Sequence, residues 1–241
     1  MRKQRYLTLE KRLSVPFWTK LAVPLASIVA GFLFSAIFLL ISGESPIEVY
    51  SVMFEGAFGS AYGLSETVVK MIPLMIISVG VAFAFKMQIW NAGGEGQLHI
   101  GAAAATYVVL HLNGCSRFVT VLLAFLAAFI CAGIYGLIPA ILKVKWKVNE
   151  LITCLMLNYV ATFFVAWLIQ GPWKDPTGFA FPRTRKIPSA GELTTFFGTR
   201  IHAGVVIGVV IALILWFILA KTKWGYEIKL IGTNPRVAEY A

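Results

Sequence analysis

The chain has 241 residues, of which 59% are apolar and only 13% are charged. Soluble domains are about 45–50% apolar and about 25% charged, so this composition excludes an ordinary soluble globule. The net charge of +10 does not indicate a nucleic-acid partner, because the basic residues gather at the ends of apolar segments.

Six apolar segments predict membrane-spanning helices. A helix needs about 20 predominantly apolar residues to cross the hydrocarbon layer, and these segments lack the alternating pattern of barrel strands. We therefore predict an all-α, polytopic membrane helix bundle. The predicted spans are residues 21–41, 67–85, 97–112, 118–142, 151–169 and 203–220.

The distribution of Lys and Arg predicts the direction of these spans. Residues 1–20 and the loop 143–150 are basic, whereas the loop 42–66 contains no Lys or Arg. Because basic residues are retained on the inner side, we predict a cytoplasmic N-terminus (residues 1–20), a membrane domain (residues 21–220) and a cytoplasmic tail (residues 221–241). The basic loop 170–202 is the exception, and long outer loops obey this rule weakly.

The outer loop 42–66 contains a helix-start signal. The sequence SPIE, from Ser45 to Glu48, predicts a capping box with proline at the first helical position. Apolar residues at 47, 50, 54 and 58 follow at near-helical spacing, so we predict a short amphipathic helix on the outer surface.

Small residues recur every four positions in three of the predicted spans. Such stripes allow helix backbones to approach closely in lipid, so we expect them to face protein. The stripes are Ala124, Ala128, Ala132, Gly136 and Ala140; Gly204, Gly208 and Ala212; and Ala22, Ala26 and Ala30.

The segment NAGGEGQ (residues 91–97) interrupts the apolar pattern between the second and third spans. Irregular backbone at membrane depth is tolerated only where protein buries it or where it lines a cavity, and a charged Glu95 there is costly. We therefore predict a broken-helix site, as transporters build them. Three alternatives remain open: a tight inner-face loop in which Glu95 caps the next helix and Asn91 closes a turn, a metal-dependent intramembrane enzyme that uses Glu95 and His99, and an ion-coupled carrier in which Glu95 carries a proton.

The chain has no GxxxxGK[ST] motif and therefore no phosphate-cradling loop of that kind. If ATP drives transport, a separate subunit must hydrolyse it and needs a docking site on the cytoplasmic face. The tail is the candidate for that site; the alternative is an ordinary connector to a seventh span. In that tail, Gly232-Thr233-Asn234-Pro235 predicts a turn followed by an Asn-capped helix that has only about six residues before the chain stops. We therefore expect the sequence to be cut off within an element.

Four blocks in order resemble the permease subunits of ABC importers of the ribose and simple-sugar class. The branch that they resemble most is associated with basic membrane lipoproteins and nucleoside uptake, and the paired glycines Gly93 and Gly94 resemble its larger permease subunit. The blocks are NAGGEGQLHIGAAAA (91–105), NELITCLMLNYVA (149–161), QGPWKDP (170–176) and KWGYEIKLIGTNPRVAEYA (223–241).

The resemblance implies a multi-pass protein of the bacterial cytoplasmic membrane that is a transport subunit and not an enzyme. Implied partners are an ABC ATPase that binds ATP and Mg²⁺, a second permease, an extracytoplasmic substrate-binding lipoprotein and membrane lipid; no cofactor is expected in this chain. Members continue for roughly a hundred residues more, which supports the expectation that this sequence is part of a longer permease.

The resemblance also assigns roles to particular residues. The substrate path or its support is assigned to Asn91, Gly93, Gly94, Glu95, Gln97 and Asn158. Docking on the ATPase is assigned to Gly232, Asn234, Pro235, Arg236 and Glu239.

Overall fold

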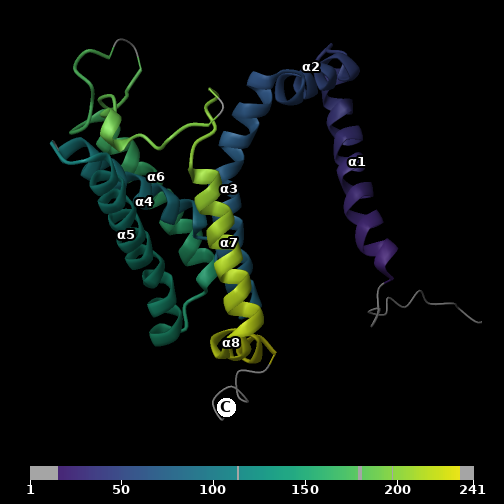
Figure 1. The fold of residues 1–241 in the computed structure, drawn as a ribbon. Helices are drawn as coiled ribbons and strands as arrows, with labels where there is room; N and C mark the ends of the chain where they lie inside the picture. The colour runs from purple at the N-terminus through teal and green to yellow at the C-terminus, as the bar shows by residue number, and fades with distance from the viewer. Residues whose placement is uncertain (1–15, 113, 179–180, 197, 234–241) are drawn as a thin grey trace, which may run out of the picture. The chain divides into compact units, whose positions relative to one another are not determined.

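The computed structural model describes residues 16–112, 114–178, 181–196 and 198–233 (Figure 1). Its regular elements are helices, with two isolated β-bridges in loops and no strand in these ranges. The chain divides into two compact units, Met1–Gly63 and Leu64–Ala241, and each is described by itself below. The predicted all-α class is confirmed.

The first unit contains α1 (Phe17–Ile41) and α2 (Pro46–Phe58), which confirms the predicted short helix after Ser45. The hydroxyl of Tyr50 donates a 2.7 Å hydrogen bond to Phe32 O and joins α2 to α1. The predicted capping box is wrong in one respect: Ser45 occupies the N-cap position in an extended conformation, but its side chain bonds no backbone N–H. No residue of α2 is buried, so water can bond the N–H groups that such a cap would satisfy.

The second unit contains most of α3 (Ala61–Lys86), followed by α4 (Gly94–His111), α5 (Arg117–Trp146), α6 (Glu150–Gln170), the 3₁₀ turn η1 (Ser189–Gly191), α7 (Gly204–Lys221) and α8 (Lys223–Thr233). Each of the six predicted spans is therefore a helix. Five described helices, α1, α3, α5, α6 and α7, are long and apolar enough to cross a membrane. The third predicted span, α4, is not among them, because polar residues occupy its first turns.

Close packing in the second unit follows the predicted stripes of small residues. α4 packs against both α5 and α6, and a Cβ added to Gly101 of α4 would lie 3.4 Å from both Ala128 O and Ala132 Cβ of α5. The predicted contact face of α5 is therefore confirmed from Ala124 to Gly136, whereas Ala140, its last member, is exposed. Gly204 and Gly208 of α7 are also buried, the second of them against Met75 of α3.

One predicted stripe is exposed in the structure, and one predicted turn is wrong. Ala22, Ala26 and Ala30 of α1 are exposed, so a protein-facing role for that stripe stays a prediction. The predicted turn at Gly232 and Thr233 is wrong, because both residues lie in α8, a helix that the local sequence pattern does not predict.

Candidate functional site

The segment between α3 and α4 is a genuine interruption of helix, and residues 87–93 are called the break below. Gln88 has a positive φ of 58°, and the N–H groups of Ile89 and Gln88 bond to Ala84 O (3.2 Å) and Phe85 O (3.1 Å). This is the bond pattern of a Schellman motif, in which a left-handed residue ends a helix. An interruption of helix at this place is confirmed, but its bounds differ from the predicted segment 91–97, because residues 94–97 form the first turn of α4. That the break lies at membrane depth stays a prediction.

Asn158, on α6, holds the far end of the break. Its Nδ2 donates a 2.9 Å hydrogen bond to Ala92 O, and its Oδ1 accepts one of 2.9 Å from Gly96 N in the first turn of α4. The first four N–H groups of a helix have no partner within the helix, and an unpaired backbone group in lipid costs several kcal/mol. The amide of Asn158, which is 9% exposed, therefore satisfies groups on both sides of the junction.

Only glycine fits at position 96 beside this amide. A Cβ at Gly96 would lie 2.8 Å from Asn158 Oδ1 and 3.2 Å from Cε1 of Tyr135 on α5. Gly96 therefore allows α4 to approach α5 and α6 closely enough for the hydrogen bond to form.

Asn91 lies in the middle of the break and shapes it from within. Its Oδ1 accepts a 3.0 Å hydrogen bond from Gly93 N, which closes an Asx turn directly before α4. The thiol of Cys154, buried on α6, lies 3.8 Å from the same oxygen. Asn91 is thus fixed by both its own loop and α6.

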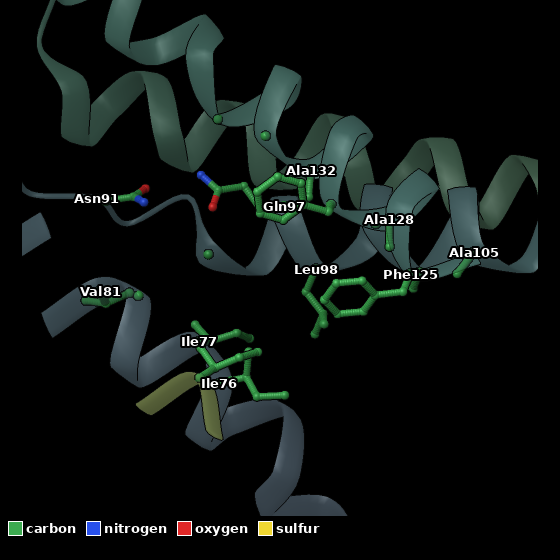
Figure 2. A pocket seen from close by; sticks show the side chains of 18 of the residues that line it. Ile76, Ile77, Val81, Asn91, Gln97, Leu98, Ala105, Phe125, Ala128 and Ala132 are labelled. Atoms are coloured by element: carbon green, nitrogen blue, oxygen red, sulfur yellow. The ribbon is translucent and has the colours of Figure 1, made fainter. Parts of the chain in front are cut away.

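A cavity of about 600 Å³ lies next to the break, between α3 and α7 on one side and α4 and α5 on the other. Figure 2 shows Asn91 and Gln97 toward one end of it and Phe125 and Ala105 toward the other. Asn91 and Gln97 are the two polar side chains that line it, and no charged side chain of the described residues does so. The walls otherwise consist of Ile76, Ile77, Gly80, Val81, Gly94, Leu98, Gly101, Ala102, Ala105, Phe125, Ala128, Phe129, Ala132, Gly133, Gly136, Ile211 and Leu215.

Gln97 extends from α4 toward Gly136 of α5, and a Cβ at Gly136 would lie 2.9 Å from its Nε2. Within the described part of the chain, the Gln97 amide makes no hydrogen bond. An amide offers two donors and one acceptor oxygen, so Gln97 can hydrogen-bond a solute in the cavity.

Glu95 occupies a different position from the other predicted path residues. It is exposed in the first turn of α4 and is not among the residues that line the cavity. There its negative charge interacts favourably with the positive end of the dipole of α4. The ring of His99 bonds to the backbone carbonyl of Glu95 (Nδ1···O 2.8 Å), and no cluster of three possible metal ligands occurs among the described residues.

Of the predicted docking residues, only Gly232 lies within the described structure; Asn234, Pro235, Arg236 and Glu239 lie outside it. Gly232 stands directly against the carbonyl oxygen of Lys86, at the end of α3, and a Cβ there would also lie 3.5 Å from Met87 Cα. The last turn of α8 therefore rests against the last residue of α3, directly before the break.

Comparison with known proteins places this architecture in a family. The family described as the permease component of the branched-chain amino acid transport system matches residues 63–241. The chain belongs to this family. It is therefore a multi-pass protein of a family of membrane transport components.

Three relatives illustrate the similarity. The glucose ABC transporter permease TsgB13 of Haloferax volcanii is 31% identical over 98% of this chain and 64% of its own length. The guanosine ABC transporter permease NupP of Bacillus subtilis is 33% identical over 92% of this chain and 64% of its own. NupQ, a second guanosine permease of that organism, is 27% identical over 72% of this chain and 56% of its own.

The chain thus spans slightly less than two thirds of the length of TsgB13 and of NupP. No solved structure matches it.

Several residues of the site were not predicted from the sequence. The sequence predicts five residues that lie in or directly behind the cavity wall: Asn91, Gly93, Gly94, Gln97 and Asn158. It does not predict a role in the site for Tyr135, Cys154 or Gly136. The sequence places Gly136 in a packing stripe, but its position opposite Gln97 depends on the register between α4 and α5, which the sequence does not show. Cys154 and Asn158 are four residues apart and therefore share a face of α6. This spacing is the sequence signal that could place Cys154 beside Asn158 at the break.

Proposed function

We propose that this chain is the membrane-spanning permease subunit of an ATP-driven importer, and that its cavity forms part of the path of an uncharged solute. One observation carries the proposal: two amide side chains, Asn91 and Gln97, lie in an otherwise apolar cavity beside a broken helix. Membrane proteins place polar groups and irregular backbone at such depth where solutes pass.

The chemistry of the cavity supports a nucleoside or simple sugar as the solute. The amides can bond hydroxyl and ring nitrogen groups, while Phe125 and Phe129 offer flat apolar faces. A volume of about 600 Å³ is within the roughly 300–1,000 Å³ that is usual for small-molecule sites. Two relatives, a permease named for guanosine and one named for glucose, support the same two classes.

The partners follow from what the sequence lacks and from the relatives. With no phosphate-cradling motif in this chain, ATP and Mg²⁺ are bound by a separate ABC ATPase, which docks on the tail that includes Gly232, Asn234, Pro235, Arg236 and Glu239. A second permease subunit completes the path, as the pair NupP and NupQ suggests, and this chain is the larger of the two. An extracytoplasmic lipoprotein delivers the solute on the outer side.

Uptake of labelled nucleosides and sugars by cells that make the full-length permease with its partner subunits tests the proposal. Gln97→Ala removes the free amide from the cavity, and we expect uptake of the transported solute to fall by up to about tenfold at unchanged membrane abundance, since one hydrogen bond contributes about 0.5–1.5 kcal/mol. Gln170→Ala is the matched control, because Gln170 is exposed at the end of α6 and lies outside the cavity wall. Unchanged uptake in Gln97→Ala, or an absence of uptake for every solute of both classes, contradicts the proposal.

A further inference from the structure

One face of α6 lies along the break. Glu150, Cys154 and Asn158 are four residues apart, so they occupy one face of the helix within its first three turns. These three residues meet three successive residues of the break. The contacts are the Glu150 carboxylate with the backbone of Trp90, Cys154 Sγ with Asn91 Oδ1 (3.8 Å), and Asn158 Nδ2 with Ala92 O (2.9 Å). The break therefore follows the direction of α6, with one of its residues at each of these turns.

The second half of the break is held together only by short local bonds of its own. Among the described residues, its backbone bonds after Ile89 join residues two positions apart, as in three-residue turns. The bonds are Asn91 N to Ile89 O and Ala92 N to Trp90 O, both 3.1 Å long. The ring of Trp90 is 61% exposed and packs on Phe85 at the end of α3, with 5.5 Å between the ring centroids. The position of this half of the break consequently depends on α6.

Lys143 orients the carboxylate that begins this row of contacts. Its Nζ lies 2.6 Å from Glu150 Oε1, and the two side chains are 38% and 21% exposed. Lys143 belongs to the last turn of α5, and Glu150 is the first residue of α6. A carboxylate has two oxygens with about four acceptor sites, so Glu150 can hold the ammonium group and the backbone of Trp90 at once. The pair thus joins the ends of two helices to the break.

The pair acts on the cavity only through the break. Neither Lys143 nor Glu150 lines the cavity, whereas Asn91, the residue after Trp90, does. The backbone of Asn91 lies between Trp90, which Glu150 contacts, and Ala92, which Asn158 holds. The direction of the Asn91 amide therefore depends on attachments on both sides of it.

We infer that Glu150, oriented by Lys143, is a positioning residue of the solute path, which holds the break against α6 and so keeps the Asn91 amide in the cavity wall. The inference rests on the proposed function, because it takes the cavity to be the path of a solute. Asn158 holds the far end of the break through neutral hydrogen bonds, and Glu150 holds the near end through a charged group. Loss of the near attachment allows Asn91 to move while Asn158 still holds the start of α4.

Cys154 is a native reporter of the position of the break. Cys154 is 2% exposed, and a Cβ at Gly93 would lie 3.3 Å from its Sγ. The small uncharged thiol reagent N-ethylmaleimide is added to the purified full-length complex, and mass spectrometry follows the modification of the peptide that contains Cys154. Displacement of the break uncovers this thiol, so the rate of its modification measures that displacement.

We expect Glu150→Ala to accelerate the modification of Cys154 roughly fivefold and to raise the apparent KM for solute uptake by a similar factor, at unchanged membrane abundance. Glu150→Gln retains an oxygen that can accept from the Trp90 N–H and should bring both values back toward those of the parent. Lys143→Met leaves the carboxylate in place without its orienting cation and should give intermediate values. This variant also tests the inference if Glu150→Ala does not assemble.

Glu66→Ala is the matched control. Glu66 forms an ion pair with Arg200 (2.9 Å), and its side chain is 22% exposed, against 21% for Glu150. It lies on α3 twenty positions before Lys86, which is about 30 Å along the helix from the break. The rate of Cys154 modification and the KM should both equal those of the parent.

Three results overturn the inference: Cys154 reacts at the parent rate in Glu150→Ala and Lys143→Met, Glu66→Ala gives the same acceleration, or Cys154 reacts faster while KM is unchanged. Uptake measurements separate this inference from the proposed function. If no nucleoside or sugar is taken up while the Glu150 effect on Cys154 persists, the transport proposal fails and Glu150 still positions the break. If uptake depends on Gln97 while Cys154 modification and KM ignore Glu150, the positioning role fails alone.

Discussion

Gly96 of α4 and Asn158 of α6 are 62 residues apart in the sequence, and a 2.9 Å hydrogen bond joins the backbone N–H of the first to the side-chain oxygen of the second. The same asparagine donates to Ala92 O. The position of α4 relative to the break is therefore determined by a side chain on another helix, and the cavity wall that contains Gln97 depends on it.

Asn158→Ala should lower both stability and uptake. The substitution leaves Gly96 N and Ala92 O without their partner in a buried place, and each unsatisfied group costs about 1–3 kcal/mol. We expect a lower midpoint of thermal unfolding for the purified full-length complex, together with reduced solute uptake. Thr162→Ala is the control, because among the described residues its hydroxyl bonds to the Asn158 carbonyl of the same helix and to no other helix. Equal thermal midpoints for the two variants would show that the Asn158 amide does not hold the junction.

The helices could be predicted from the sequence because their cause is local. All six apolar segments are helices in the structure, and their ends differ from prediction by six residues at most, at the start of α3. Long apolar runs must satisfy their backbone hydrogen bonds internally, which leaves little choice of structure. An interruption between α3 and α4 could also be predicted, since three glycines within four residues (93–96) disturb that pattern, but Gly94 and Gly96 lie in the first turn of α4 and not in the break itself.

Features that depend on long-range contact could not be predicted from local patterns. α8 begins two residues after α7 ends and has glycines at positions 225 and 232, which local propensity counts against a helix. Its last turn is placed by the contact between Gly232 and Lys86, which are 146 positions apart. In the same way, the exposure of Glu95 depends on the rotation of α4 about its axis, which Gly96 and Asn158 set.

Gly136→Ala should reduce uptake with little effect on stability. An added Cβ would lie 2.9 Å from Gln97 Nε2, the mobile end of a side chain, so the Gln97 amide moves aside and loses its position in the cavity. We expect the apparent KM for the solute to rise several-fold while the thermal midpoint of the complex remains within experimental error.

Gly133→Ala provides a matched comparison for this prediction. Gly133 also lines the cavity and lies on α5, but an added Cβ there would meet nothing within 4 Å. Its uptake should stay close to that of the unaltered protein. If both alanine variants raise KM equally, loss of cavity volume and not displacement of Gln97 is the cause.

Gly232→Ala should separate α8 from the end of α3. The new Cβ would overlap the carbonyl oxygen of Lys86, and backbone cannot move aside as a flexible side chain does. Overpacking of this kind costs about 1–3 kcal/mol.

Gly56→Ala is the control, since Gly56 lies in α2 with open space around its Cβ position, and alanine in a helix is favoured over glycine by about 0.5–1 kcal/mol. Thermal unfolding of the purified complex should show a lower midpoint for Gly232→Ala and an equal or higher one for Gly56→Ala. Co-purification of the ATPase, measured on the same samples, reports whether the contact also supports docking of the tail. An unchanged midpoint for Gly232→Ala would mean that α8 does not rest on Lys86 in the membrane.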